Sequence, residues 1–155
     1  MEEIEFQKIR NLLTEAGDAI MEVYKSDCFF TELKSDNTPV TRADKASSRI
    51  LNEGLKKQFP LLPILDEETS IPAHETRSKW EEYFLIDPLD GTKEFVNRNG
   101  EFCINLALIR GTSPELGWIY QPLTQTGWFC ERGRGIIEFK KNGDGINLSV
   151  PETTY

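Results

Sequence analysis

The chain has 155 residues, and its 18 Lys and Arg against 26 Asp and Glu give a net charge of −8. The absence of a basic cluster argues against nucleic-acid binding and against attachment to an anionic membrane, since both depend on clustered Lys and Arg. No apolar run approaches the roughly 18 residues of a membrane-spanning helix, and residues 1–5 lack the positive start of a secretory signal. We therefore expect a cytoplasmic protein.

Two helical patterns come first along the chain. Apolar side chains between residues 9 and 24 recur with helical spacing and form a single stripe. A second helix is predicted to begin at Thr41, because Thr41 and Asp44 have the spacing of a capping box. Pro60 is expected to end it.

Most of the remaining sequence favours short strands separated by turns. The expected strands are residues 28–33, 63–65, 83–86, 103–109, 116–120, 127–130, 136–139 and 146–150. The expected turns are residues 34–39, 110–114, 133–135 and 142–145. Two helices followed by a run of strands predict an α+β fold, with both helices packed on one face of a mostly antiparallel sheet.

Cysteine and histidine offer little metal chemistry here. Cys28, Cys103 and Cys130 are far apart and form no C-x-x-C pair, so neither a zinc site nor a disulfide framework is predicted. We expect them to be reduced, packed thiols. The one histidine, His74, lies in a polar stretch and is expected to be a solvated loop residue. Any bound metal would be held by carboxylates, which favours hard cations such as Mg²⁺.

Two of the predicted strands lead into acidic residues, and because the sheet positions carboxylates at the ends of its strands, we expect these residues to converge. Residues 65–68 read Leu-Asp-Glu-Glu, and residues 87–92 read Asp-Pro-Leu-Asp-Gly-Thr. Gly91 and Thr92 offer backbone N–H groups at the start of a predicted helical turn, which suits phosphate oxygens. Carboxylates beside an anion site require a cation between them. The pattern therefore indicates metal-assisted phosphoryl transfer to water.

The same residues have an ordinary interpretation. Asp-Pro-x-Asp-Gly-Thr is also a favourable surface turn. Glu67 is equally interpreted as a solvated residue, and Asp44 as a helix-start residue. On spacing alone, both interpretations stay open.

Three motifs together resemble the inositol monophosphatase superfamily of Mg²⁺-dependent, Li⁺-sensitive phosphatases. They are residues 39–44 (Pro-Val-Thr-Arg-Ala-Asp), 65–68 and 85–92, in the order and spacing of that family. The continuation at residues 93–102 is similar to the 3′(2′),5′-bisphosphate nucleotidase branch. Inositol phosphatases usually have Thr-Asn after the shared motif, where this chain has Lys93-Glu94.

The resemblance implies a set of metal ligands. Glu67, Asp87 and the backbone carbonyl of Leu89 would hold one Mg²⁺, and Asp87 and Asp90 would hold a second, shared ion. Two or more Mg²⁺ ions are thus the expected cofactors, and Li⁺ is the expected inhibitor.

It also implies catalytic and substrate contacts. Thr92, hydrogen-bonded to Asp44, would orient and deprotonate the attacking water. The backbone amides of Gly91 and Thr92 would bind the substrate phosphate, with Glu67 beside it.

This sequence departs from the family pattern in two places. Asp66 stands where a small residue is usual, and it is expected either to raise metal affinity or to face solvent. The next residue, Glu68, is expected either to contact the metal ligands from behind or to be exposed to solvent. The family also has a downstream Trp-Asp motif, whereas each tryptophan here precedes another residue: Trp80-Glu81, Trp118-Ile119 and Trp128-Phe129.

We therefore expect residues 1–155 to be the N-terminal metal-binding α+β domain of a sugar or nucleotide phosphatase. This is the N-terminal half of the family's αβαβα sandwich, without the C-terminal domain. Such a chain would be weakly active or inactive, and it would form homo-oligomers through its exposed domain face.

The activity that the resemblance implies is that of a phosphoric monoester hydrolase. Its substrate would be adenosine 3′,5′-bisphosphate, a by-product of sulfate activation, hydrolysed to AMP and phosphate. The partner is then a small nucleotide bisphosphate, and no nucleic acid or membrane is expected. An inositol or sugar monophosphatase is one alternative, and a non-catalytic metal-binding or association domain is another.

Overall fold

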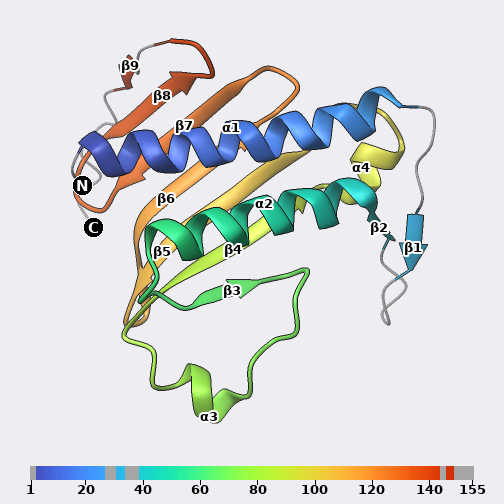
Figure 1. Cartoon of the computed structure of the whole chain (residues 1–155). Coiled ribbons are helices and arrows are strands. Elements are labelled where there is room, and N and C mark those ends of the chain that lie inside the picture. Colours follow the sequence, from blue (N-terminus) through green and yellow to red (C-terminus); the bar gives the residue numbers. More distant parts are fainter. Residues whose placement is uncertain (1–2, 27–30, 34–38, 144–145, 149–155) are drawn as a thin grey trace.

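Two long helices lie against one face of a seven-stranded sheet in the computed structural model, which describes residues 3–26, 31–33, 39–143 and 146–148 (Figure 1). Helix α1 spans Glu3–Lys25, and helix α2 spans Arg42–Gln58. They pack so closely that a Cβ on Gly54 would lie 2.1 Å from the side chain of Leu12.

Helix α2 begins where the sequence predicts. Thr41 is its N-cap, and the capping box between Thr41 and Asp44 is formed in both directions. The helix ends at Gln58, two residues before Pro60. The start of α2 is therefore held by side chains that also belong to the candidate site.

The sheet is antiparallel except at one edge. Its order is β3-β4-β5-β6-β7-β8-β9, and only β3 and β4 run parallel. The strands are β3 (Ile64–Asp66), β4 (Glu82–Asp90), β5 (Cys103–Arg110), β6 (Ser113–Gln121), β7 (Thr126–Glu131), β8 (Ile136–Lys140) and β9 (Ile146–Leu148). A separate pair joins β1 (Thr31–Leu33) to β2 (Pro39–Thr41), and α3 (His74–Arg77) and α4 (Thr92–Val96) are single helical turns.

The core lies between the helices and the near face of the sheet. Alternate strand residues such as Phe84, Ile86, Ile104 and Leu106 are buried there, together with the apolar stripe of α1. Because side chains alternate along a strand, their neighbours point to the opposite face.

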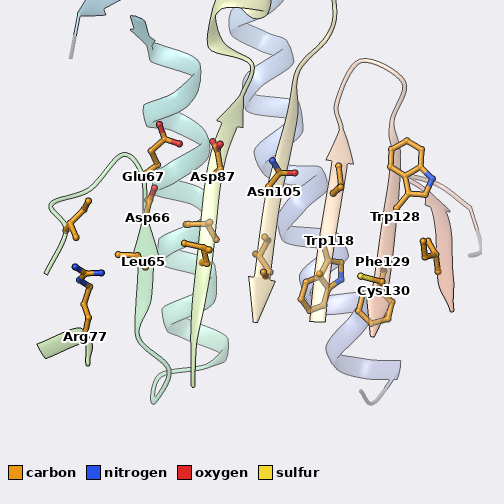
Figure 2. A pocket seen from close by; sticks show the side chains of 18 residues that line it. Leu65, Asp66, Glu67, Arg77, Asp87, Asn105, Trp118, Trp128, Phe129 and Cys130 are labelled. Carbon is orange, nitrogen blue, oxygen red and sulfur yellow. The ribbon is translucent and has the colours of Figure 1, made fainter. Parts of the chain in front are cut away.

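That opposite face carries an apolar trough of about 650 Å³ (Figure 2). Leu85 and Ile119 line it with 41% and 47% of their surfaces exposed, and Trp128 and Cys130 flank them. The acidic residues Glu67 and Asp87 stand at one end of the trough.

The predicted α+β fold, with two helices on one face of a mostly antiparallel sheet, is confirmed. In the part of the chain that the structure describes, no helix is both long and apolar enough to cross a bilayer. Residues 28–30, 34–38, 144–145 and 149–150 of the predicted strands and turns lie outside the described residues, as does Cys28.

Three local predictions are wrong. Residues 113–114 belong to β6, because the β5–β6 connection is tight and needs only two residues. His74 is exposed as expected, but it begins the one-turn helix α3 instead of lying in a loop. Cys130 is exposed on the trough side of β7 and is not packed in the core.

Candidate active site

The parallel pairing of β3 and β4 brings the two acidic segments together. Asp66 lies opposite Ile86 in the register, and the Glu67 N–H donates to the Ile86 carbonyl at 3.3 Å. Carboxyl ends of parallel strands meet at the same edge of a sheet, so Glu67 and Asp87 stand side by side (Figure 2). The predicted convergence of the two segments is present in the structure.

Asp87 lies in the middle of this acidic group. Its carboxyl is half-buried, and burial raises its pKa from the ordinary 3.8 to about 7, with the charges of Glu67 and Asp90 adding to the rise. The Leu89 N–H donates to Asp87 Oδ1 at 3.2 Å, which partly opposes that rise in the pKa. Three carboxylates that repel one another in this way favour a cation between them.

The strand itself loosens where these residues lie. The pairing of β4 with β5 shifts register between Asp87 and Asp90. Asp90 is exposed, and Asn105 Nδ2 on β5 donates to its Oδ2 at 3.0 Å. The irregularity therefore frees the backbone of residues 88–89 from the ladder with β5.

The predicted hydrogen bond between Thr92 and Asp44 is present. Thr92 Oγ1 donates to Asp44 Oδ1 at 3.0 Å, and it also lies 3.2 Å from the Leu89 carbonyl oxygen. Asp44 is buried, and its Oδ2 accepts from the backbone N–H and the hydroxyl of Thr41 at 2.7 and 2.6 Å. Asp44 is thus held rigidly behind the Thr92 hydroxyl.

Gly91 makes the turn between β4 and α4. Its φ of 89° is a left-handed conformation that favours glycine, and a Cβ there would lie 2.6 Å from the carbonyl oxygen of Glu101. The buried Phe95 donates its N–H to the Gly91 carbonyl at 2.8 Å and anchors the following helical turn. This packing fixes Thr92 directly after the turn.

Sequence reasoning missed two residues that support the site. Ser47 on α2 is buried and donates its hydroxyl to the Pro88 carbonyl at 2.7 Å, and Asn105 holds Asp90. Both left a signal in the sequence. Ser47 follows Asp44 by three residues on a predicted helix, and Asn105 is a polar residue inside an otherwise apolar strand.

The solvent-facing alternative for Asp66 is wrong. Asp66 is buried, and Ser48, Asn52 and the Glu68 N–H all donate to its carboxylate. Glu68 is half-buried, between the two positions expected for it. Ser48 and Asn52 lie on α2, so this contact could not be found within the acidic motif itself.

The donor set fits a hard divalent cation. Among the described residues, no group of three or more His, Cys, Asp or Glu side chains is already close enough to hold a metal ion. The ligands predicted here include a backbone carbonyl, however, and all of them are oxygens, as Mg²⁺ prefers. The nearby thiol of Cys103 is a soft donor that suits Mg²⁺ poorly, and burial with the charges of Asp90 and Asp87 raises its pKa to about 11 in the metal-free chain.

Comparison with known proteins agrees with this fold. The family model described as the inositol monophosphatase family matches residues 1–153 of the chain. The chain therefore belongs to the inositol monophosphatase family, and the resemblance seen in its sequence motifs is confirmed.

Within that family, the curated relatives include proteins named 3′(2′),5′-bisphosphate nucleotidase CysQ. The one from Salmonella typhimurium is 43% identical over 133 residues, covering 85% of this chain and 54% of the relative. The one from Haemophilus influenzae is 39% identical over 142 residues, covering 90% of this chain and 51% of the relative. The chain spans about half the length of the curated relatives it matches.

Solved structures share the same architecture. CysQ from Bacteroides thetaiotaomicron is 31% identical with a TM-score of 0.67, covering 86% of this chain and 49% of that chain. The extragenic suppressor protein suhB from Bartonella henselae is 26% identical with a TM-score of 0.77, covering 87% of this chain and 52% of that chain.

Proposed function

We propose that this chain carries the metal ligands of a Mg²⁺-dependent phosphatase that removes the 3′-phosphate from adenosine 3′,5′-bisphosphate, giving AMP and phosphate. The observation that carries the proposal is the grouping of Glu67, Asp87 and Asp90 beside the hydrogen-bonded pair of Thr92 and Asp44. The name shared by the CysQ relatives supports the choice of substrate.

The acidic residues would hold the cations. Glu67, Asp87 and the Leu89 carbonyl would bind one Mg²⁺, and Asp87 with Asp90 would bind the second. When bound, the cations would neutralise the phosphate charge and lower the pKa of the attacking water. Asn105 would keep the Asp90 carboxylate oriented, since it already donates to one of its oxygens.

Thr92 and Asp44 would move the proton. Because Asp44 accepts the Thr92 hydroxyl proton, the Thr92 oxygen can in turn accept a proton from the attacking water. Asp44 stays in place during this transfer, since Thr41 holds its other oxygen with two hydrogen bonds. The backbone amides of Gly91 and Thr92, with Glu67 nearby, would contact the phosphate.

Phosphate release tests the proposal directly. The chain is incubated with adenosine 3′,5′-bisphosphate, with inositol 1-phosphate or with a sugar phosphate, in excess Mg²⁺ or in EDTA. We expect phosphate to be released faster from the nucleotide than from the other two substrates, and only when Mg²⁺ is present. The Asp90→Asn variant should release none. Faster release from inositol 1-phosphate would favour the inositol monophosphatase instead.

A second outcome is a chain that binds Mg²⁺ but hydrolyses its substrate slowly or not at all. Thermal unfolding with Mg²⁺ up to tens of millimolar separates this from a chain without a metal site. Stabilisation that Asp90→Asn abolishes, without phosphate release, would favour a non-catalytic metal-binding domain. Equal melting temperatures in Mg²⁺ and in EDTA would contradict the metal site itself.

A further inference from the structure

A buried carboxylate lies next to the proposed ligand Glu67 and has no part in the proposed function. Asp66 is only 1% exposed, although it ends the edge strand β3. Its Oδ2 accepts hydrogen bonds from Ser48 Oγ and Asn52 Nδ2, both at 2.5 Å. Because both donors lie on α2, Asp66 ties the end of β3 to that helix.

Asp66 also shapes the loop that carries Glu67. Its Oδ1 accepts the Glu68 N–H at 2.9 Å, and its carbonyl accepts the N–H and the hydroxyl of Thr69, both at 3.2 Å. These bonds close a turn over residues 66–69, with Glu67 at the first central position. Aspartate is favoured at the start of such a turn, because its side chain can bond to the N–H two residues on.

Helix α2 holds the other acidic segment with the same face. The polar residues of that face are spaced three, four and eight positions after the first: Asp44, Ser47, Ser48 and Asn52. Ser47 contacts the Pro88 carbonyl at 2.7 Å, directly after Asp87. One helix therefore contacts both acidic strand ends, which the β3–β4 pairing already places side by side.

We propose that Asp66, held by Ser48 and Asn52, is a positioning residue that orients Glu67 for a divalent cation. The inference rests on the proposed function, and it concerns a residue that stands outside the predicted ligand set. Outer partners of metal ligands commonly change metal affinity by about 10–100-fold when they are mutated. We therefore expect Asp66→Asn to weaken Mg²⁺ binding about 10-fold, since Asp66 accepts at both carboxylate oxygens and asparagine keeps only one acceptor oxygen.

A second variant separates position from charge. Asp66→Asn removes a negative charge near the cation, whereas Ser48→Ala removes one hydrogen bond and leaves every carboxylate intact. Titration calorimetry with MgCl₂ is expected to show weaker binding in both variants. Wild-type affinity in Ser48→Ala would mean a charge effect alone and would overturn the proposal.

Thr126→Val is the matched control for a general loss of stability. Thr126 is buried on β7, three strands from β4, and its hydroxyl accepts from Lys140 Nζ at 2.6 Å. This variant should lower the melting temperature without changing Mg²⁺ binding. An equal loss of affinity in Thr126→Val and Asp66→Asn would overturn the positioning role.

Hydrogen exchange of the Glu68 amide gives a readout that needs no metal. Asp66→Asn should speed this exchange selectively, because the amide loses a charged acceptor, whereas Thr126→Val should not. Unchanged Glu68 exchange in Asp66→Asn would overturn this inference alone. A wild-type chain that binds no Mg²⁺ would instead overturn the proposed function and, with it, the role of Asp66 in metal binding.

Discussion

Removing the charge of Asp87 is expected to stabilise the metal-free chain while it destroys the metal site. Asp87 has a pKa of about 7 in the folded chain, against 3.8 ordinarily, because burial and the neighbouring carboxylates Glu67 and Asp90 disfavour its charged form. Asn is uncharged and nearly the same shape, and it keeps an oxygen for the Leu89 N–H. The variant Asp87→Asn therefore relieves the repulsion without leaving a cavity.

The size of the effect follows from that shift in the pKa. About three pKa units correspond to about 4 kcal/mol at roughly 1.4 kcal/mol each. The carboxyl is only half-buried, so solvent screening reduces this to about 1–2 kcal/mol. In a chain of this size, that gain should raise the melting temperature by about 2–8 °C.

The raised pKa of Asp87 also predicts how the stability of the folded chain changes with pH. A carboxyl with a raised pKa binds its proton more tightly in the folded chain, so the folded state loses stability as the pH rises from about 4 to about 7. Asp87→Asn should therefore exceed the wild type at pH 8 in EDTA and match it near pH 4. The exposed Glu15 on α1 supplies the control variant Glu15→Gln, which should change nothing.

In Mg²⁺, the wild type should become more stable than Asp87→Asn. A cation at about 100 times its Kd adds roughly 2.7 kcal/mol to the wild type, and the variant should gain little of it. Thermal unfolding at pH 4 and pH 8, in EDTA and in Mg²⁺, measures all of these differences. An Asp87→Asn variant that is no more stable than the wild type at pH 8 in EDTA would refute the reasoning.

Three further predictions concern the proton path, the turn and the trough. Where Mg²⁺-dependent turnover is measurable, Asp44→Asn should lower kcat by about 10²–10⁴-fold and leave the Mg²⁺ titration unchanged. Turnover near the wild-type rate would mean that Asp44 only starts helix α2. Gly91→Ala should cost about 1–3 kcal/mol in chemical denaturation, because its φ is positive and a Cβ meets the Glu101 carbonyl; an unchanged midpoint would contradict this. The chain should self-associate through the exposed apolar trough, so Ile119→Lys should give a monomer by light scattering. A wild-type chain that stays monomeric at high concentration would contradict this.

The helices and most strands could be predicted because their signals are local. The capping box of Thr41 and Asp44 needs only residues three apart, and the structure contains it. The β6 boundary was missed because Ser113 and Pro114 read as turn residues, although their ladder partners on β5 decide their conformation.

Where a strand is apolar on both faces, it was harder to predict which side chains point to the helices and which to the opposite face. In β7, Phe129 packs against Phe6 of α1 while Trp128 and Cys130 point to the trough, and hydrophobicity alone does not distinguish the two faces. For that reason Cys130 was wrongly expected in the core.

The candidate site likewise contains some features that the local sequence predicts and others that depend on distant residues. The grouping of Glu67 with Asp87 was predicted from acidic residues that follow apolar strands, and the link between Thr92 and Asp44 came from the family resemblance. The burial of Asp66 depends on Ser48 and Asn52, which belong to another element. A sequence read one motif at a time does not reveal such a contact.

The single parallel strand pair has a consequence for how this family can change. Residues 67–81 connect β3 to β4, yet the strand register places Asp66 opposite Ile86 independently of that connection. Lengthening a loop costs little, about 0.6 kcal/mol for each doubling of its length. Insertions between residues 71 and 81 can therefore reshape the rim beside the acidic residues while their spacing is conserved. The arrangement separates a connection that can vary in length from Glu67 and Asp87, the proposed metal ligands, so the rim could change while their spacing is kept.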